Sequence, residues 1–159
     1  MTELEQALQQ AEAEEQALVL PGFTNDDALA LGLWLVEAAR RRGVAIAVDV
    51  ERAGQRLFHH AMAGTTPDNA SWIERKKRLV QRWHRSSWSM GLRNQLKGRT
   101  LADQLGAAAA DYADHGGCLP LVVQGVGFVG TVAVSGLPQK DDHDLVVEAL
   151  RALLARPRG

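Results

Sequence analysis

The sequence is poor in the features that mark secreted and membrane proteins. Its 159 residues include one cysteine, Cys118, so no internal disulfide can form, as is typical of proteins in a reducing compartment. The longest apolar runs are interrupted by charged residues and are too short to cross a bilayer. The acidic segment 1–16 lacks the basic and apolar regions of a secretory signal. We therefore expect a cytoplasmic protein that has no membrane partner.

Positive charge is missing from the first quarter of the chain. Residues 1–39 contain eight acidic residues and no lysine or arginine, whereas residues 40–99 contain fourteen basic and four acidic residues. The net charge is only −1, so no overall charge attracts the chain to nucleic acid. The uneven distribution predicts either an anion-attracting surface in the middle of the chain or self-association through complementary patches.

Motifs of the common enzyme classes are also missing. The chain has no G-x-S-x-G elbow and no phosphate-binding P-loop, which leaves a named hydrolase or NTPase unsupported. His143 lies between two aspartates, but no second histidine stands at a metal-ligand spacing such as H-x₃-H. We therefore expect no metal site, and the sequence favours a protein without catalysis over an enzyme.

The residues that are present predict one domain over 1–159, made of a helical extension over 1–17 and a main domain over 18–154. Propensity and capping signals predict helices over 3–17, 24–43, 70–85 and 87–98, a short helix within 100–117, and a last helix after Pro138. Asp68 or Asn69 should cap the helix over 70–85. One side of that helix should carry apolar residues with Lys76, and the other should carry Lys77 with the arginines.

Two pairs of β-branched segments predict hairpins over 44–62 and 119–135. The segment "VAIAVDV" in the first hairpin is of the kind that is buried on both faces of a sheet. Hairpins separated by helices indicate an antiparallel sheet with helices packed on it. The fold class is therefore α+β, a sandwich, and not a doubly wound parallel fold.

The second hairpin contains "GVGFVG" over residues 125–130, which has the G-x-G-x-x-G spacing of a dinucleotide-binding loop. That loop needs a helix directly after its glycines, because the helix N-terminus holds the pyrophosphate. Here the β-branched segment "TVAV" follows instead. We interpret Gly125 as a turn residue with positive φ, and Gly130 as a bulge or a close approach of two backbones.

Several separated motifs resemble one known family. These are "HGGCLPLVVQGVGFVGTVAVSGLPQKDDHDLVVEAL", "LFHHAMAGTTPDNASWIERKKRLV" and "ALGLWLVEAA". They resemble the haem-degrading-domain superfamily, the GlcG/HbpS-like proteins, in its branch of small uncharacterised cytosolic proteins. The similarity extends from about residue 18 to residue 154.

The resemblance implies a profilin-like or PAS-like sandwich with a five-stranded antiparallel sheet, and it implies a homo-oligomer. It also implies haem as a possible cofactor, because the superfamily is named after a few haem-binding members. It carries over no haem-ligand motif position by position, and it does not imply haem degradation in this branch.

The first candidate site is His59-His60 on the second expected strand. Neighbouring side chains of a strand point to opposite faces, so one histidine should face a helix or a pocket and the other should face solvent. Either imidazole could ligate a haem iron. The alternative is a sheet histidine with an ordinary hydrogen bond.

The second candidate is the basic segment "ERKKRLVQRWHR". Arg75, Lys76 and Arg78 could bind haem propionates, a phosphate or the carboxylate of a metabolite. The alternatives are a solvated helix face and an oligomer contact with the acidic N-terminal segment. We do not expect nucleic-acid binding, because the tryptophans of this region suit burial better than base stacking.

The third candidate is "DHGGCLP", which brings together His115, Gly116, Gly117 and Cys118. Glycines let backbone N–H groups approach a ligand, and a nearby histidine could add a hydrogen bond. Cys118 is either a reactive thiol or, as we favour, a buried and inert cysteine at the start of a strand. We expect any pocket to lie near this segment and the basic helix.

These observations favour an oligomeric protein that binds or senses a small ligand, either haem or another anionic metabolite. Two alternatives stay open. One is an interaction or scaffold protein without chemistry of its own. The other is an enzyme that acts on an unidentified small metabolite through a basic pocket and a histidine.

Overall fold

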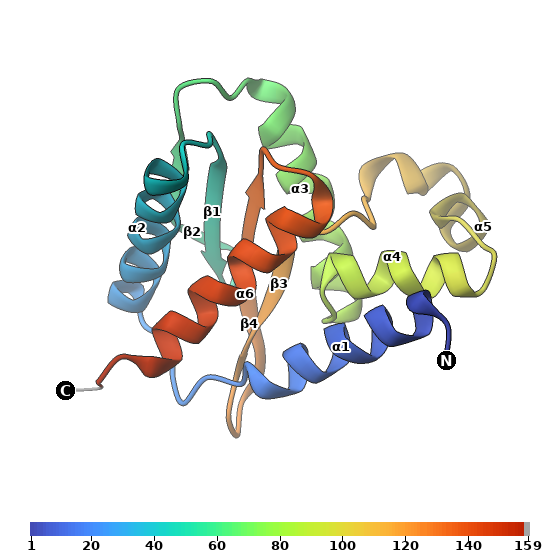
Figure 1. The fold of residues 1–159 in the computed structure, drawn as a ribbon, viewed down its shortest axis with the longest axis horizontal. Helices are drawn as coiled ribbons and strands as arrows, with labels where there is room; N and C mark the ends of the chain where they lie inside the picture. Colours follow the sequence, from blue (N-terminus) through green and yellow to red (C-terminus); the bar gives the residue numbers. More distant parts are fainter. Residues whose placement is uncertain (158–159) are drawn as a thin grey trace.

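The computed structural model describes residues 1–157 and shows an α+β fold built around one antiparallel sheet (Figure 1). The helices are α1 (Glu3–Ala17), α2 (Asn25–Arg42), α3 (Pro67–Trp83), α4 (Ser87–Leu96), α5 (Leu101–Leu105), the 3₁₀ helix η1 (Gly106–Asp111) and α6 (Gln139–Ala155). The strands are β1 (Ala47–Arg52), β2 (Gln55–Ala61), β3 (Cys118–Val123) and β4 (Gly127–Ser135).

The strands lie in the order β2-β1-β4-β3, and every neighbouring pair is antiparallel. Helices α2 and α6 pack on one face of the sheet, and α3 packs on the other. Figure 1 shows α6 crossing the strands on the near side of the sheet and α3 behind it. Helix α1 packs along α4 at one end of the molecule. The sheet is therefore the middle layer of a three-layer sandwich.

Side-chain alternation along the strands gives the two faces of the sheet different chemistry. Val48, Val50 and Val132 are fully buried in the apolar core beneath α2 and α6. The opposite face carries Asp49 and Thr131, which are also fully buried, beneath α3. Strand β1 is buried on both faces, as its sequence predicted, but its second face is polar.

The second hairpin confirms the interpretation of its glycines. Strands β3 and β4 are joined by a turn in which Gly125 has φ +76°, and the chain continues from Gly127 as strand and not as helix. Gly130 lies against the backbone of β1, where a Cβ would overlap the carbonyl oxygen of Glu51. The glycines shape a hairpin and let two strands pair closely.

The expectation of five strands is wrong for the described residues, in which the sheet has four. A fifth segment begins to pair with β3 but forms only one parallel bridge, between Leu20 and Val123. The Leu20 N–H donates to the Val122 carbonyl and the Leu20 carbonyl accepts from Gln124, each at 2.8 Å. The chain bends at Pro21, and no second bridge follows in the described residues.

Helix α3 starts earlier than predicted, and its cap is Thr66, not Asp68 or Asn69. The Asn69 side chain accepts a hydrogen bond from the Thr66 N–H at 3.0 Å, and Pro67 occupies the first turn, where its missing N–H costs nothing. The prediction that Lys77 faces away from the core is also wrong, because Lys76 and Lys77 are both buried.

Candidate functional site

A pocket of about 270 Å³ lies where the first half of α3, the end of β4 and the start of α6 meet. Polar side chains dominate its lining. The residues are Asp68, Asn69, Trp72, Lys76, His115, Ser135, Gly136, Leu137, Gln139 and Asp142. We call it the Lys76–Asp142 pocket, after the two charged groups at its floor.

These two groups form a buried ion pair. Lys76 Nζ lies 3.4 Å from Asp142 Oδ2, and each side chain is only 3% exposed. The ammonium also donates to the carbonyl oxygen of Val134 on β4 at 3.1 Å. The second oxygen of Asp142 accepts a hydrogen bond from the Leu137 N–H at 3.0 Å. The pair thus ties α3 to β4 and to the first turn of α6.

Burial shifts both groups toward neutrality. It raises the pKa of Asp142 to about 6, although the Lys76 charge and the N–H groups of Leu137 and Gly136 oppose the rise. It lowers the pKa of Lys76, and the nearby Asp142 carboxylate offsets only part of that decrease. A perturbed pair in a cleft is a recognised mark of a functional site.

The walls of the pocket hold aromatic and amide groups. The Trp72 and His115 rings lie 5.0 Å apart between centroids, and the Arg75 guanidinium lies 4.1 Å from the centroid of Trp72 on α3. Asn69 donates from its amide nitrogen to the hydroxyl of Ser135 at 3.1 Å. These groups offer a flat surface and several hydrogen-bonding atoms around the buried ammonium.

Two glycines next to the pocket let the backbone pack closely, Gly117 against Lys76 and Gly116 against α6. Gly117 has φ +133°, and a Cβ there would lie 2.6 Å from Lys76 Nζ and 2.7 Å from the Val134 carbonyl oxygen. A Cβ at Gly116 would overlap the backbone of α6 at Gln139, whose side chain instead accepts the Gly116 N–H at 2.9 Å. The missing side chains let the backbone pack directly against the ammonium and α6.

The structure brings together part of the predicted site residues. Lys76 and His115 line the pocket, and Arg75 stacks on a pocket tryptophan. Gly117 lies against Lys76, and Gly116 lies against the start of α6. Arg78 lies elsewhere and donates to the Asp111 carbonyl at 3.2 Å.

His59 and His60 lie apart from this pocket, on the edge strand β2, where both are exposed. His59 Nδ1 is 3.5 Å from the buried carboxylate of Asp49. Cys118 is fully buried, and burial raises the pKa of its thiol far above the usual range, which suits an inert side chain.

Sequence reasoning missed a second ionic cluster beneath α3. Lys77 Nζ lies 2.8 Å from Glu51, 3.0 Å from Asp49 and 3.4 Å from Glu74. Arg56 also pairs with Asp49, at 2.8 Å. Burial alone would lower the pKa of Lys77, but the carboxylates of Glu51 and Asp49 raise it overall. The signal in the sequence is the alternation Val-Asp-Val-Glu over 48–51, which gives β1 one acidic face.

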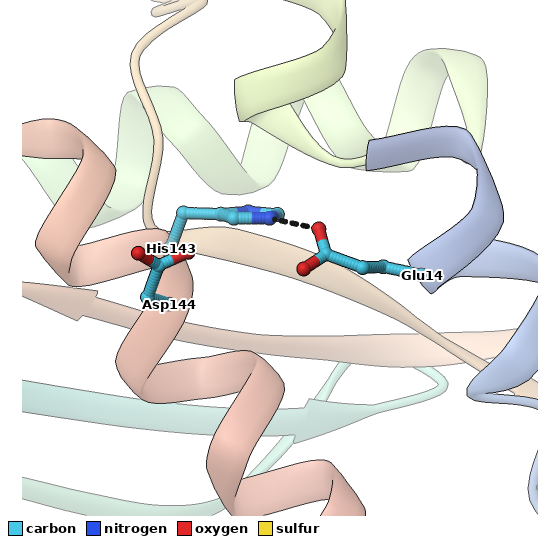
Figure 2. Close-up of side chains that lie close together, drawn as sticks. All are labelled: Glu14, His143 and Asp144. Atoms are coloured by element: carbon cyan, nitrogen blue, oxygen red, sulfur yellow. Dashed lines mark hydrogen bonds and ion pairs between the residues drawn. The ribbon is translucent and has the colours of Figure 1, made fainter. Parts of the chain in front are cut away.

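A third polar contact joins α1 to α6. Figure 2 shows the buried His143 ring directed at the carboxylate of Glu14, with Nε2 at 2.9 Å from Oε1. Asp144 is close to both, and the three residues offer ligand atoms within 4.8 Å of one another. Asp144 already pairs with Lys140, however, and His143 with Glu14. We therefore interpret the contact as the attachment of α1 to the domain.

Known proteins are similar to this chain in sequence and in fold. A UPF0303 protein of Streptomyces avermitilis is 53% identical over 146 residues, which cover 92% of this chain and 90% of that protein. The crystal structure of the Ybr137w protein is similar with a TM-score of 0.84 and 29% identity, covering 92% of this chain and 87% of that one. The PduOC structure, solved as a complex with heme, has a TM-score of 0.71 over 82% of this chain and 94% of that one. At 19% identity it shows the fold alone.

None of the helices in the described part of the chain is long and apolar enough to span a bilayer. The family model for haem degrading HbpS-like proteins matches residues 23–151, and this match confirms the resemblance seen in the sequence motifs. The chain therefore belongs to the HbpS-like family of haem degrading proteins.

Proposed function

We propose that this chain binds a small metabolite that carries a carboxylate, in the Lys76–Asp142 pocket. The observation that supports this most directly is the buried ammonium at the pocket floor. Lys76 has three N–H groups but only two acceptors among the described residues, Val134 and Asp142. A carboxylate oxygen of a ligand can supply the third acceptor and a charge-assisted hydrogen bond.

The surrounding groups suit the rest of such a ligand. Asn69 and Gln139 present side-chain amides, His115 presents an imidazole, and Trp72 presents a flat apolar surface. A few polar groups around one apolar wall are typical of small-molecule sites. The volume of about 270 Å³ suits a compact metabolite of a few carbon atoms.

Ligand charge should couple to the protonation of Asp142. An anion next to this carboxylate favours its protonated form and raises its pKa above the value of about 6. The affinity for an anionic ligand should therefore increase as the pH falls from 8 to 6, with proton uptake on binding.

Haem is a second candidate, because the family is named for haem degradation and the PduOC neighbour was solved with heme. The residues of the pocket do not fit a buried haem. The pocket is smaller than the 300–1,000 Å³ typical of larger ligands, its lining is mainly polar, and its one imidazole is the exposed His115. We therefore assign no step of binding or chemistry to haem here.

Amide chemical shifts can test the proposal. Acetate, lactate, pyruvate and glyoxylate should each be titrated into ¹⁵N-labelled protein, and saturable shifts should appear at Gly116, Gly117 and Gly136. They should disappear in Lys76→Met and persist in Lys140→Met, a control that removes an exposed lysine of α6. Shifts that never saturate, or that persist unchanged without Lys76, would refute binding at this site.

A haemin titration distinguishes the second candidate. A saturable change in the Soret band that is lost in His115→Ala would favour haem at the pocket. A change lost only when His59 and His60 are both replaced by alanine would place haem on β2, as the sequence suggested. If neither variant alters the spectrum, these histidines do not ligate haem.

We also propose that the chain forms a homo-oligomer, as the family resemblance implies. Leu29 and Leu33 lie one turn apart on α2 and are 49% and 54% exposed. Helix α2 packs against the edge strand β2, so this apolar stripe lies beside an unpaired sheet edge. Light scattering should show an assembly that Leu29→Glu with Leu33→Glu dissociates, and a wild-type monomer at all salt concentrations would refute it.

A further inference from the structure

We propose that Lys76 forms a reversible imine with the carbonyl group of a small 2-oxo acid bound in the Lys76–Asp142 pocket. This inference rests on the proposed ligand-binding function and names the ligand class. Three features of the geometry support it: the amine lies at the floor of a pocket, a carboxyl group lies beside it, and Gly117 lies against it.

The position of the amine favours addition to a carbonyl carbon. Lys76 is one of the residues that line the pocket, yet its side chain is only 3% exposed, so few water molecules compete with a ligand for its amine. Burial also lowers the pKa of Lys76, which increases the share of neutral amine, the nucleophilic form. The Gly117 backbone and the Val134 carbonyl hold the amine in place.

Asp142 can move the protons that the reaction requires. The Lys76 ammonium first gives one proton to the Asp142 carboxylate, and the neutral nitrogen then attacks the carbonyl carbon. The C–N bond forms, the carbonyl electron pair moves to oxygen, and a proton passes from nitrogen to that oxygen. Asp142 returns its proton to the hydroxyl group, which leaves as water. The balance is one ammonium and one carbonyl giving one iminium and one water, with no oxidant or reductant.

The pKa of Asp142, raised by burial to about 6, suits a group that must both accept and return a proton near neutral pH. The carboxylate of the 2-oxo acid would meet the amides of Asn69 and Gln139 and the imidazole of His115, which line the same pocket. The neighbouring acids Asp68 and Asp141 are exposed, so solvent screens their charge at this amine.

Lys77 provides an internal comparison. Its side chain is also 3% exposed, but its ammonium is surrounded by the carboxylates of Asp49, Glu51 and Glu74, and it does not line this pocket. The carboxylates of Glu51 and Asp49 raise the pKa of Lys77 overall, against the effect of burial. Two adjacent lysines of one helix should therefore differ strongly in reactivity.

Reductive trapping on the wild-type protein tests the inference. The protein is incubated with glyoxylate or pyruvate and sodium cyanoborohydride at pH 7, digested, and mapped by tandem mass spectrometry. A lower pKa leaves more of an amine in its neutral, nucleophilic form, so Lys76 should be alkylated severalfold faster than Lys77 or the exposed Lys140. Lys76→Arg should remove this adduct, and Asp142→Asn should slow its formation.

The non-carbonyl partners glycolate and lactate separate the two proposals. If glyoxylate and glycolate both shift the pocket amides but Lys76 is not alkylated faster than Lys140, the imine is refuted and carboxylate binding stands. If neither acid shifts those amides, the proposed function itself fails. Preferential alkylation of Lys76 that excess lactate suppresses supports both.

Discussion

Lys76→Met removes the ammonium from the pocket floor and keeps a side chain of similar length. It leaves the Asp142 carboxyl group, which is 3% exposed, without its cation. A buried carboxylate that loses its partner takes up a proton, because the neutral form is less costly to bury. The pKa of Asp142 is already raised to about 6 by burial in the presence of Lys76, and the substitution should raise it beyond the neutral range.

Linkage between protonation and folding sets the size of the effect. An acid whose pKa rises on folding contributes stability below its unfolded pKa, and this contribution is lost as the pH rises through the folded pKa. In the wild type the pKa of Asp142 rises from 3.8 in the unfolded chain to about 6 in the folded one. The decrease in unfolding free energy therefore stops near pH 6, where it amounts to about 3 kcal/mol. In Lys76→Met the Asp142 carboxyl group keeps its proton above pH 6. The unfolding free energy of the variant therefore continues to decrease, by about 1.4 kcal/mol for each further pH unit.

The variant should therefore show a difference in unfolding free energy that depends on pH. The contribution of Asp142 to this free-energy difference should be zero at pH 5. It should increase to about 1.4 kcal/mol at pH 7 and to about 2.7 kcal/mol at pH 8. The carbonyl of Val134 loses a donor in the same variant, which adds about 1–3 kcal/mol at every pH.

Urea unfolding followed by tryptophan fluorescence at pH 5, 6, 7 and 8 measures this difference. Lys140→Met is the matched control, because Lys140 forms an exposed pair with Asp144 on α6 and its loss should cost under about 0.5 kcal/mol at each pH. A destabilisation of Lys76→Met that is equal at pH 5 and pH 8 would refute the coupling between Lys76 and Asp142.

Two further predictions concern the frame of the pocket. Gly117→Ala puts a Cβ 2.6 Å from Lys76 Nζ at φ +133°, whereas the control Gly125→Ala at φ +76° meets no atom within 4 Å. Urea unfolding should show a loss of about 3 kcal/mol for the first and about 1 kcal/mol for the second, and equal losses would contradict the close packing. Burial raises the pKa of Glu14, but the hydrogen bond and charge of His143 lower it overall. The ionised Glu14 therefore stabilises the folded state above pH 4.5, and this stabilisation is lost as the pH falls through its lowered pKa. Glu14→Gln should increase hydrogen exchange in α1 at pH 7 and do so by less at pH 4, and an equal increase at both would contradict this assignment.

Local signals in the sequence predicted the parts of the fold that local chemistry decides. The hairpin over β3 and β4 follows from β-branched segments around Gly125, whose positive φ closes the turn. Helix α2 follows from capping signals at both ends of segment 24–43, where Thr24, Asn25 or Asp26 could begin it, and the structure shows Thr24 and Gly43 as its caps. The fifth strand was expected only through the family resemblance, and the segment at Leu20 forms only one bridge in the described residues.

Contacts between distant segments could not be predicted in the same way. Glu14 and His143 are 129 positions apart, and neither has a neighbour in sequence that indicates the pairing. The pocket lies between the two segments that the sequence singled out, the basic helix and His115–Gly117, but its floor depends on Asp142. In the sequence Asp142 is one of several acids that follow Pro138 at the start of the last helix, and only the packing of α6 beside α3 brings it to Lys76.

The burial of two adjacent lysines follows from the face of the sheet on which α3 rests. A helix that covers an apolar sheet presents one apolar stripe to it, and a helix of that kind would direct the Lys77 side chain toward solvent. Here the sheet face beneath α3 carries buried polar residues beside small apolar ones, so the helix pairs with it through charge as well as through Ile73 and Val80. Lys77 reaches the acids of β1, while Lys76 reaches β4 and α6, where a pocket opens. Lys77 is therefore surrounded by carboxylates, whereas Lys76 has a single carboxylate partner and lines a pocket. This difference makes Lys76 the residue to test first.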